Sequence, residues 1–135
     1  MLVDTNVWSE LSRPRPDERV RRWFADNLSD CMLSSIVLAE MRYGVALADG
    51  SRRTELDAFV ADLLTRLSDR IVDFDANAAA VWGPLRARLQ RSGMLIGERD
   101  MLIAAQAVAR DIPLVTRNVS DMARTDAVIV NPWLD

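Results

Sequence analysis

The chain has 135 residues, half of them apolar and 27% charged, which is the balance of a single globular domain spanning residues 1–135. Its net charge of −3 gives no overall attraction to nucleic acid. The sequence has no histidine and its 17 basic residues are all arginine, which excludes histidine bases, the usual zinc ligands, P-loop lysines and Schiff bases.

The sequence offers no membrane segment. No stretch reaches the ~18 consecutive apolar residues of a membrane span. A secretory signal would begin with basic residues, whereas this chain opens on an apolar run that Asp4 interrupts. We therefore expect a cytoplasmic protein. The single cysteine, Cys31, lies in an apolar stretch and is predicted to be a buried thiol.

The first eight residues predict a short buried strand followed at once by a helix. The apolar run from Met1 ends at Asp4, and a helical apolar pattern begins at Val7 and Trp8. Functional groups of open α/β sheets gather outside the carboxyl ends of the strands, where Asp4 would lie. The alternative is that Asp4 only caps the helix. A cap tolerates Asp4→Asn, whereas among crowded carboxylates this change should raise the melting temperature of the metal-free protein.

A proline-rich segment and an arginine cluster follow. The helix from Val7 to Leu11 is expected to stop near Pro14 and Pro16, and helix resumes at Asp17. The arginines of this region are Arg13, Arg15, Arg19, Arg21 and Arg22. They are typical of a solvated helix face, with an RNA-facing patch as the alternative.

A second strand and helix follow, and the helix carries an acid on its apolar face. Residues 31–34 read as a buried strand, and Ser35 as the cap of a helix over residues 36–47. At 3.6 residues per turn, Glu40 shares a face with Ile36 and Val37. A carboxylate on an apolar stripe is costly unless a partner satisfies it.

The middle of the chain predicts two further helices. Apolar residues recur at helical spacing over residues 54–67. Residues 71–75 form a short strand or extended link, after which Asp75 caps a helix from Ala76 towards Gln90 that Gly93 ends.

The last third carries the remaining acids. A helix begins near Glu98, and its Asp100 lies in line with Ile103, Ala104 and Ala107. A favourable helix dipole explains an acid in the first turn, but not one on the buried face. Strands over residues 112–116 and 127–130 follow, with Asp121 in the loop between them. Strands alternating with helices predict an α/β fold with a mostly parallel sheet and helices on both faces.

Four acids are thus expected at one crevice: Asp4, Glu40, Asp100 and Asp121. Like charges in such proximity raise each other's pKa values and destabilise a fold unless a cation gathers them. Mg²⁺ suits an all-oxygen site, and such a site can activate water for phosphodiester displacement. That chemistry needs neither histidine nor lysine.

At these residues the chain closely resembles the PIN-domain family, and within it the VapC-type ribonuclease toxins of toxin–antitoxin pairs. Blocks along essentially the whole chain carry the resemblance: residues 4–7, 34–44, 93–107, 116–121 and 130–133. The resemblance implies a PIN-like three-layer sandwich and an endonuclease that cleaves RNA with Mg²⁺ or Mn²⁺. It also implies a homodimer that a cognate antitoxin silences.

The same resemblance implies roles for individual residues. Asp4, Glu40 and Asp100 would hold the first metal, and Asp121 would support it or a second one. Thr116 and Asn118 would hydrogen-bond the acids or a phosphate oxygen. Asn6 would orient Asp4 or cap the first helix. Met122 stands where the family usually has an aromatic residue.

Two other interpretations of the function remain. An aspartyl-phosphate phosphatase or receiver domain also gathers acids at strand ends, but relies on a lysine that this chain lacks. A non-catalytic PIN fold would work only by binding a protein partner. We expect large apolar residues around Trp8 and Trp23 to receive an antitoxin segment, because aromatics dominate interface anchors.

Overall fold

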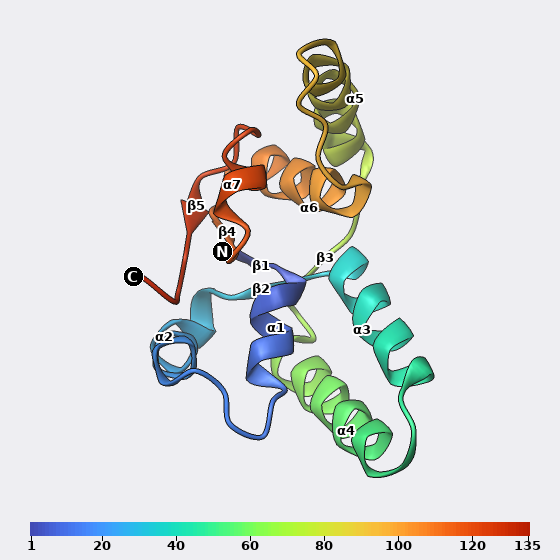
Figure 1. Ribbon diagram of the computed structural model, residues 1–135, viewed down its shortest axis with the longest axis vertical. Helices are drawn as coiled ribbons and strands as arrows, with labels where there is room; N and C mark the ends of the chain where they lie inside the picture. The colour runs from blue at the N-terminus through green and yellow to red at the C-terminus, as the bar shows by residue number, and fades with distance from the viewer.

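A five-stranded parallel sheet forms the centre of the protein, whose computed structural model describes residues 1–135 (Figure 1). Its strands are β1 (Leu2–Val3), β2 (Met32–Ser34), β3 (Ile71–Val72), β4 (Leu114–Val115) and β5 (Ile129–Val130). They lie in the order β3-β2-β1-β4-β5, and every neighbouring pair is parallel. The predicted parallel α/β fold is therefore confirmed.

Helices cover both faces of this sheet. They are α1 (Thr5–Leu11), α2 (Glu18–Asn27), α3 (Ser35–Leu47), α4 (Gly50–Leu67), α5 (Ala76–Arg91), α6 (Glu98–Ala109) and α7 (Val119–Met122), with a 3₁₀ turn, η1, at Leu28–Asp30. The chain moves from β1 to β3 in one direction across the sheet and then returns past β1 to β4. Right-handed crossovers therefore place α1 to α4 on one face and α5 to α7 on the other, as Figure 1 shows. None of these helices combines the length and apolar character needed to cross a membrane.

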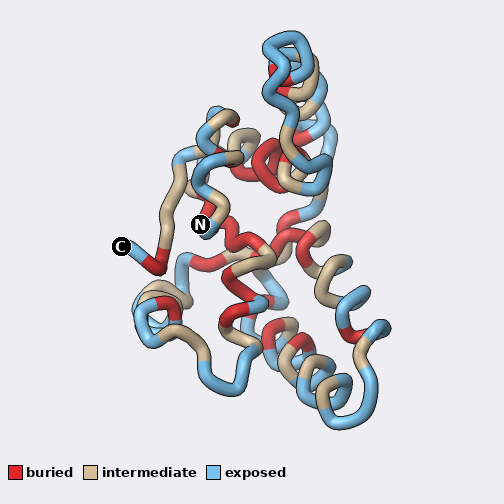
Figure 2. The backbone as a smooth tube through the Cα atoms, in the orientation of Figure 1, coloured by how far each residue is buried: buried red, intermediate tan, exposed pale blue.

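The core lies where the sheet meets these layers (Figure 2). The side chains of β1 and β4 are fully buried, which explains why both strands are apolar throughout. Ala104 and Ala107 of α6 are also fully buried, and their small side chains let this helix approach the sheet closely. Cys31 is buried as predicted, and burial raises the pKa of its thiol to about 11.

Several local predictions need correction. The strands are two or three residues long, shorter than their apolar runs suggested. Ser34, and not Ser35, caps α3, because its hydroxyl accepts from the N–H of Ile36 at 3.1 Å. The helix predicted over residues 54–67 begins earlier, at Gly50. Asp121 lies within the short helix α7 and not in a loop.

The turn between α5 and α6 follows its sequence signal. Gly93 has a φ of +68°, a conformation that costs glycine little. Its N–H donates to the carbonyl of Gln90 at 3.2 Å, and the N–H of Met94 donates to that of Leu89 at 2.8 Å. This pair of bonds is a Schellman motif, so Gly93 ends the helix as predicted.

A candidate acidic active site

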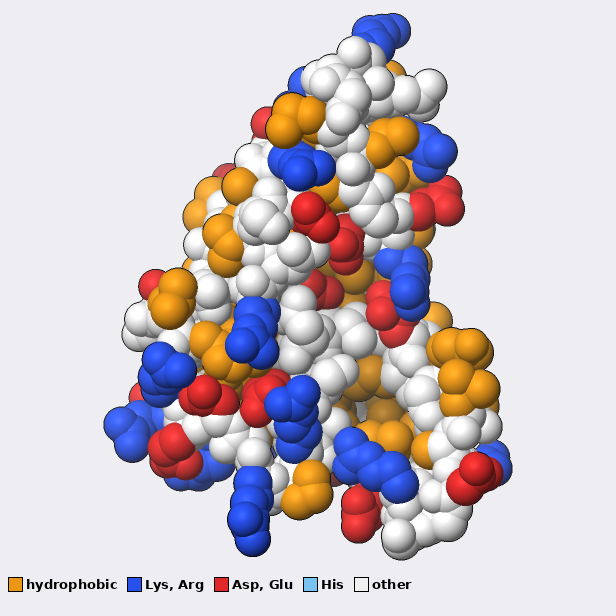
Figure 3. All heavy atoms as spheres, viewed as in Figure 1, with side chains coloured by type: hydrophobic (Ala, Val, Ile, Leu, Met, Phe, Trp, Pro, Cys, Tyr) orange, Lys and Arg blue, Asp and Glu red, His pale blue; other side chains and the backbone are white.

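The sheet order creates a crevice at the carboxyl ends of β1 and β4. The chain leaves β1 towards β2 on one side, and it enters β4 on the other side after crossing the sheet. Parallel sheets bind their ligands at such switch points. A cleft of about 380 Å³ opens there, and its lining includes Asp4, Glu40 and Asp100. Figure 3 shows acidic side chains in the hollow of this face and arginine side chains around it.

Asp4 follows β1 directly and is held by three donors. One carboxylate oxygen, Oδ1, accepts from the backbone N–H of Thr5 at 2.7 Å. The other, Oδ2, accepts from the hydroxyl of Thr116 at 2.7 Å and from Asn6 Nδ2 at 3.0 Å. Asp4 is 4% exposed. It is the N-cap of α1 and a residue of the cleft at once, so the two roles weighed from the sequence are not alternatives.

Thr116 connects Asp4 to the rest of this edge. Because Val3 pairs with Val115 across β1 and β4, the residues that follow them, Asp4 and Thr116, come out side by side. The Thr116 hydroxyl accepts from Asn6 Nδ2 and from the N–H of Asn118, both at 3.0 Å. Its single hydrogen is therefore directed to Asp4, and the carboxylate has one orientation.

Asn118 holds two more of the predicted acids. Its side-chain NH₂ group donates to Asp100 Oδ2 at 3.1 Å and to Asp121 Oδ2 at 3.3 Å. Asp121 also lies 4.0 Å from a guanidinium nitrogen of Arg124. Asp100 lines the cleft, whereas Asp121 is not among the residues that line it. Asp121 thus lies outside the cleft and shares the Asn118 donor with Asp100.

Glu40 reaches the cleft from the opposite helix, α3. Its side chain is 18% exposed, so it lies at the edge of the apolar face that the helical spacing indicated. No hydrogen bond from the protein reaches this carboxylate. Its one ion pair joins Oε2 to Nη1 of Arg99, at 3.3 Å.

A buried bridge sets the two acid-bearing helices relative to each other. The Ser34 hydroxyl, at the start of α3, donates to Gln106 Oε1 of α6 at 2.6 Å. Gln106 Nε2 in turn donates to the carbonyl of Val72 in β3 at 3.1 Å. Both side chains are essentially inaccessible to water. The bridge therefore fixes α3, with Glu40, against α6, with Asp100.

The acids influence one another electrostatically. Burial raises the pKa of Asp4, and the charge of Glu40 adds to this effect against the hydrogen bonds from Thr116, Thr5 and Asn6. Burial also raises the pKa of Asp100, and the charges of Asp4 and Asp121 raise it further. The charges of the four carboxylates therefore meet in one cluster, and the fold disfavours the ionised states of Asp4 and Asp100.

These raised pKa values predict a pH dependence of stability. In the unfolded chain both carboxyls return to an ordinary pKa of 3.8. An acid with a raised folded pKa stabilises the fold below its unfolded pKa and loses that contribution as the pH rises through the folded pKa. In EDTA, the melting temperature of Asp100→Asn minus that of wild type should therefore increase between about pH 4 and about pH 7.

A control variant isolates this effect from the other titrating groups. Asp126 is 74% exposed and pairs with Arg88 on the surface, so Asp126→Asn should show a much smaller change with pH. Thermal melts monitored by circular dichroism give both differences. A pH-independent difference for Asp100→Asn would contradict the linkage.

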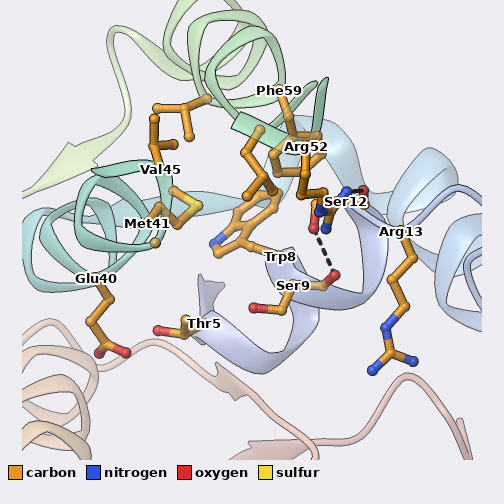
Figure 4. A pocket seen from close by; sticks show the side chains of 13 residues that line it. Thr5, Trp8, Ser9, Ser12, Arg13, Glu40, Met41, Val45, Arg52 and Phe59 are labelled. Carbon is orange, nitrogen blue, oxygen red and sulfur yellow. Dashed lines mark hydrogen bonds between the residues drawn. The ribbon is translucent and has the colours of Figure 1, made fainter. Parts of the chain in front are cut away.

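The donor set of the cleft fits a hard divalent cation. It consists of oxygen atoms of mutually repelling carboxylates, and the buried Thr5 hydroxyl has no hydrogen-bond partner. Figure 4 shows this hydroxyl on the side of α1 that faces Glu40. No three carboxylates are arranged to enclose an ion by themselves. Mg²⁺ keeps several of its waters, so a few carboxylates and an open cleft suit it.

The structure places the arginines of the predicted patch in different environments. Arg19, Arg21 and Arg22 pair with acids at the start of their own helix and form a solvated face. The arginines that line the cleft are Arg13, Arg99 and Arg117. Sequence reasoning missed the last two, because they come from segments far apart in the chain. The guanidinium of Arg117 lies 5.0 Å from the ring centre of Trp133, which packs beside the cleft.

Comparisons with known proteins all indicate the same family. A PIN domain family model matches residues 1–128. The chain is 37% identical to "VapC ribonuclease Y4jK" of Sinorhizobium fredii, over 98% of this chain and 97% of that protein. It is 36% identical to "Toxin FitB" of Neisseria gonorrhoeae, over 100% and 99% of the two chains.

Solved structures agree with these relatives. The crystal structure of FitAcB from Neisseria gonorrhoeae matches with a TM-score of 0.90 and 36% identity, over 98% of this chain and 97% of that one. VapBC2 from Rickettsia felis, solved with a DNA fragment from its promoter, matches with a TM-score of 0.85 and 30% identity, over 96% of each chain. The similarity therefore includes both the sequence and the whole fold.

Proposed function

Because this chain belongs to the PIN-domain family, we propose that it is a metal-dependent endoribonuclease and the toxin of a toxin–antitoxin pair. The observation that carries the proposal is the cluster of four carboxylates at the switch point of the sheet. Relatives named as a VapC ribonuclease and a toxin support both parts of it. In this proposal the protein hydrolyses RNA phosphodiester bonds and thereby inhibits translation and growth.

Asp4, Glu40 and Asp100 would hold Mg²⁺, with Mn²⁺ as a substitute, and Asp121 would support Asp100. A bound ion would help to ionise the attacking water and offset the negative charge that develops on the phosphate. The protein's own contribution is to fix its carboxylates in place. Such preorganisation saves reorganisation at the moment of reaction.

Each supporting residue limits the movement of one acid. Thr116 and Asn6 together leave Asp4 one orientation. Asn118 keeps Asp100 and Asp121 side by side in spite of their repulsion. These three side chains are already engaged with the acids, which favours a positioning role over direct contact with RNA.

The direct test is cleavage of RNA by the purified protein. We expect cleavage of single-stranded RNA in millimolar Mg²⁺ or Mn²⁺, and no cleavage in excess EDTA. A non-catalytic PIN fold that acts only through a protein partner would cleave in neither condition. Sequencing the new RNA ends would then identify the target, since such enzymes read mostly single-stranded loops.

A second groove, beside the acid cleft, suits the antitoxin. It has a volume of about 300 Å³, lies between α1, α3 and α4, and is lined in part by Met41, Val45 and Phe59 (Figure 4). Four residues, Thr5, Ser9, Arg13 and Glu40, line both this groove and the cleft, so the two are continuous. We propose that an antitoxin segment fills the groove and thereby reaches the acids.

This placement differs from the interface predicted around the two tryptophans. Trp8 is fully buried and its indole N–H donates to the carbonyl of Val3, so it forms the floor of the groove and not an exposed anchor. Trp23 lies on α2 and does not line the groove. In this proposal the apolar contact surface comes from α3 and α4.

A charge placed in the groove should block the partner. Leu56 lines the groove but does not belong to the main core, so Leu56→Asp should leave the fold intact. We expect it to weaken antitoxin binding by about 2 kcal/mol or more, roughly thirtyfold in Kd. Titration calorimetry with the cognate antitoxin measures this change.

The matched control is Leu47→Asp, which adds the same charge at a leucine that is 64% exposed and lies outside the groove. Its affinity for the antitoxin should equal that of wild type. Equal effects of the two variants would place the interface elsewhere. Light scattering of the free protein would test the homodimer that the family resemblance implies.

A further inference from the structure

Arg99 forms an ion pair that spans the acid cleft. It precedes Asp100 in the first turn of α6, and its guanidinium lies 3.3 Å from Glu40 on α3. The Arg99 side chain is 66% exposed, whereas that of Glu40 is 18% exposed. Because the pair is open to solvent on the arginine side, it is a weak interaction that other partners can replace.

Glu40 differs from the other acids in its surroundings. Asp4 accepts three hydrogen bonds from the protein, and Asp100 and Asp121 share the Asn118 side chain. The Glu40 carboxylate has Arg99 alone. Its oxygens are therefore the ones most free to bind a cation, and the arginine guanidinium already occupies that position.

The other arginines of the cleft have different partners. Arg13 pairs at 2.9 Å with Glu10, which is buried and accepts from the N–H of Asp17. The guanidinium of Arg117 packs over Trp133. Arg99 is thus the arginine of the cleft whose partner is a proposed metal ligand.

We propose that Arg99 changes partner when metal and RNA bind. It pairs with Glu40 in the metal-free protein; once a divalent ion takes the Glu40 carboxylate, its guanidinium binds an RNA phosphate beside the scissile bond. A guanidinium matches a phosphate through two parallel hydrogen bonds and has no proton to lose at neutral pH. The inference rests on the proposed nuclease function and makes Arg99 a substrate-binding residue.

Two opposite effects follow for Arg99→Ala. Metal binding no longer has to displace a cation, so the variant should bind Mg²⁺ severalfold more tightly than wild type. RNA binding in the presence of metal should weaken, because one phosphate contact is lost. In wild type, metal and RNA therefore strengthen each other's binding through Arg99, and this coupling should be reduced in the variant.

The test uses the full chain and three variants. Arg99→Ala removes the guanidinium, and Arg99→Lys keeps the charge without the planar fork. Arg88→Ala is the matched control, because Arg88 forms a comparable surface ion pair with Asp126, at 3.4 Å, on a different part of the molecule. Thermal melts establish that all variants fold.

Two titrations give the readouts. Calorimetry measures Mg²⁺ affinity without RNA. Fluorescence anisotropy measures the binding of a mixed-sequence single-stranded RNA in EDTA and in Ca²⁺, a divalent ion with oxygen ligands, with the RNA checked for integrity. In Ca²⁺, the slope of log affinity against log salt should be less steep by about 0.7 for Arg99→Ala, the value of one phosphate contact on a single strand. In EDTA the slopes should be equal.

Arg99→Lys should resemble wild type in Mg²⁺ affinity and lie between wild type and Arg99→Ala in RNA affinity. If Arg99→Ala behaves like Arg88→Ala in both titrations, the ion pair is an ordinary surface contact and the inference is wrong. Weaker Mg²⁺ binding by Arg99→Ala would also overturn it, since Arg99 would then support Glu40 and not compete for it. A wild type that neither binds Mg²⁺ nor cleaves RNA would instead refute the proposed function.

Discussion

Asp100→Asn is expected to reduce RNA cleavage in Mg²⁺ by at least about a hundredfold while the protein stays folded. A metal ion contributes several kcal/mol to the stabilisation of such transition states, and each ~1.4 kcal/mol corresponds to a factor of ten in rate. Asp100 is one of the three predicted acids that line the cleft, and its carboxylate accepts one hydrogen bond from a side chain, that of Asn118. An amide oxygen can accept that bond, so the loss reports on the charge and not on misfolding.

Asp126→Asn serves as the control because it removes the same charge from a solvated surface ion pair. Initial rates on a fluorescent single-stranded RNA, compared at equal concentrations of folded protein, measure both variants. Cleavage by Asp100→Asn within a few fold of wild type would sink the proposed mechanism.

Asp4→Asn and Asp100→Asn are expected to change the stability of the metal-free protein in opposite directions. In Asp4→Asn the NH₂ group must face either the Thr5 N–H, or both Asn6 Nδ2 and the Thr116 hydroxyl. A buried donor left without an acceptor costs about 1–3 kcal/mol, which outweighs the relief of repulsion. Asp4→Asn should therefore melt several degrees below wild type, in contrast to the gain expected from charge repulsion alone. Asp100→Asn loses no such bond and should melt at or above wild type.

Added Mg²⁺ should increase the melting temperature of wild type relative to that of these variants. A ligand at a hundredfold excess over its Kd stabilises the folded state by about 2.7 kcal/mol. Wild type should gain stability in millimolar Mg²⁺, whereas Asp4→Asn and Asp100→Asn should gain much less. Thermal melts of the three proteins, with EDTA and with Mg²⁺, give all the values. Equal Mg²⁺ responses would mean that these acids do not share a metal. A destabilised Asp100→Asn in EDTA would contradict the repulsion that raises the pKa of Asp100.

The sequence predicted the fold and three of the acids that line the cleft, Asp4, Glu40 and Asp100, because each depends on local patterns. The apolar run that ends at Asp4 indicates a strand end, and helical spacing aligns Asp100 with residues that prove to be buried. Parallel strands then bring such positions to one edge of the sheet. The outcome for Asp4 shows the limit of this reasoning, because its capping bond and its place in the cleft are compatible in three dimensions.

Contacts between distant side chains could not be predicted in the same way. The pairing of Arg99 with Glu40 depends on the distance between α6 and α3, which no local pattern sets. The same holds for Trp8, whose aromatic character suggested an exposed anchor although the helix turns it into the core. Asp121 was assigned to a loop because a helix as short as α7 leaves little periodic signal.

The buried bridge between Ser34 and Gln106 constrains how this sequence can evolve. The two positions are 72 residues apart in the chain, yet each satisfies the other's buried polar group. A substitution at one of them alone leaves an orphaned donor or acceptor. An apolar pair would also remove the acceptor of the Ile36 N–H and the donor to the Val72 carbonyl, so the replacement has to be another polar pair. Homologous chains should therefore vary at these two positions together. A chimera that takes α6 from a relative should also take β2 from that relative, because Gln106 and Ser34 lie on these two elements. The spacing of the proposed catalytic acids is thus inherited through a pair of buried residues that do not line the cleft.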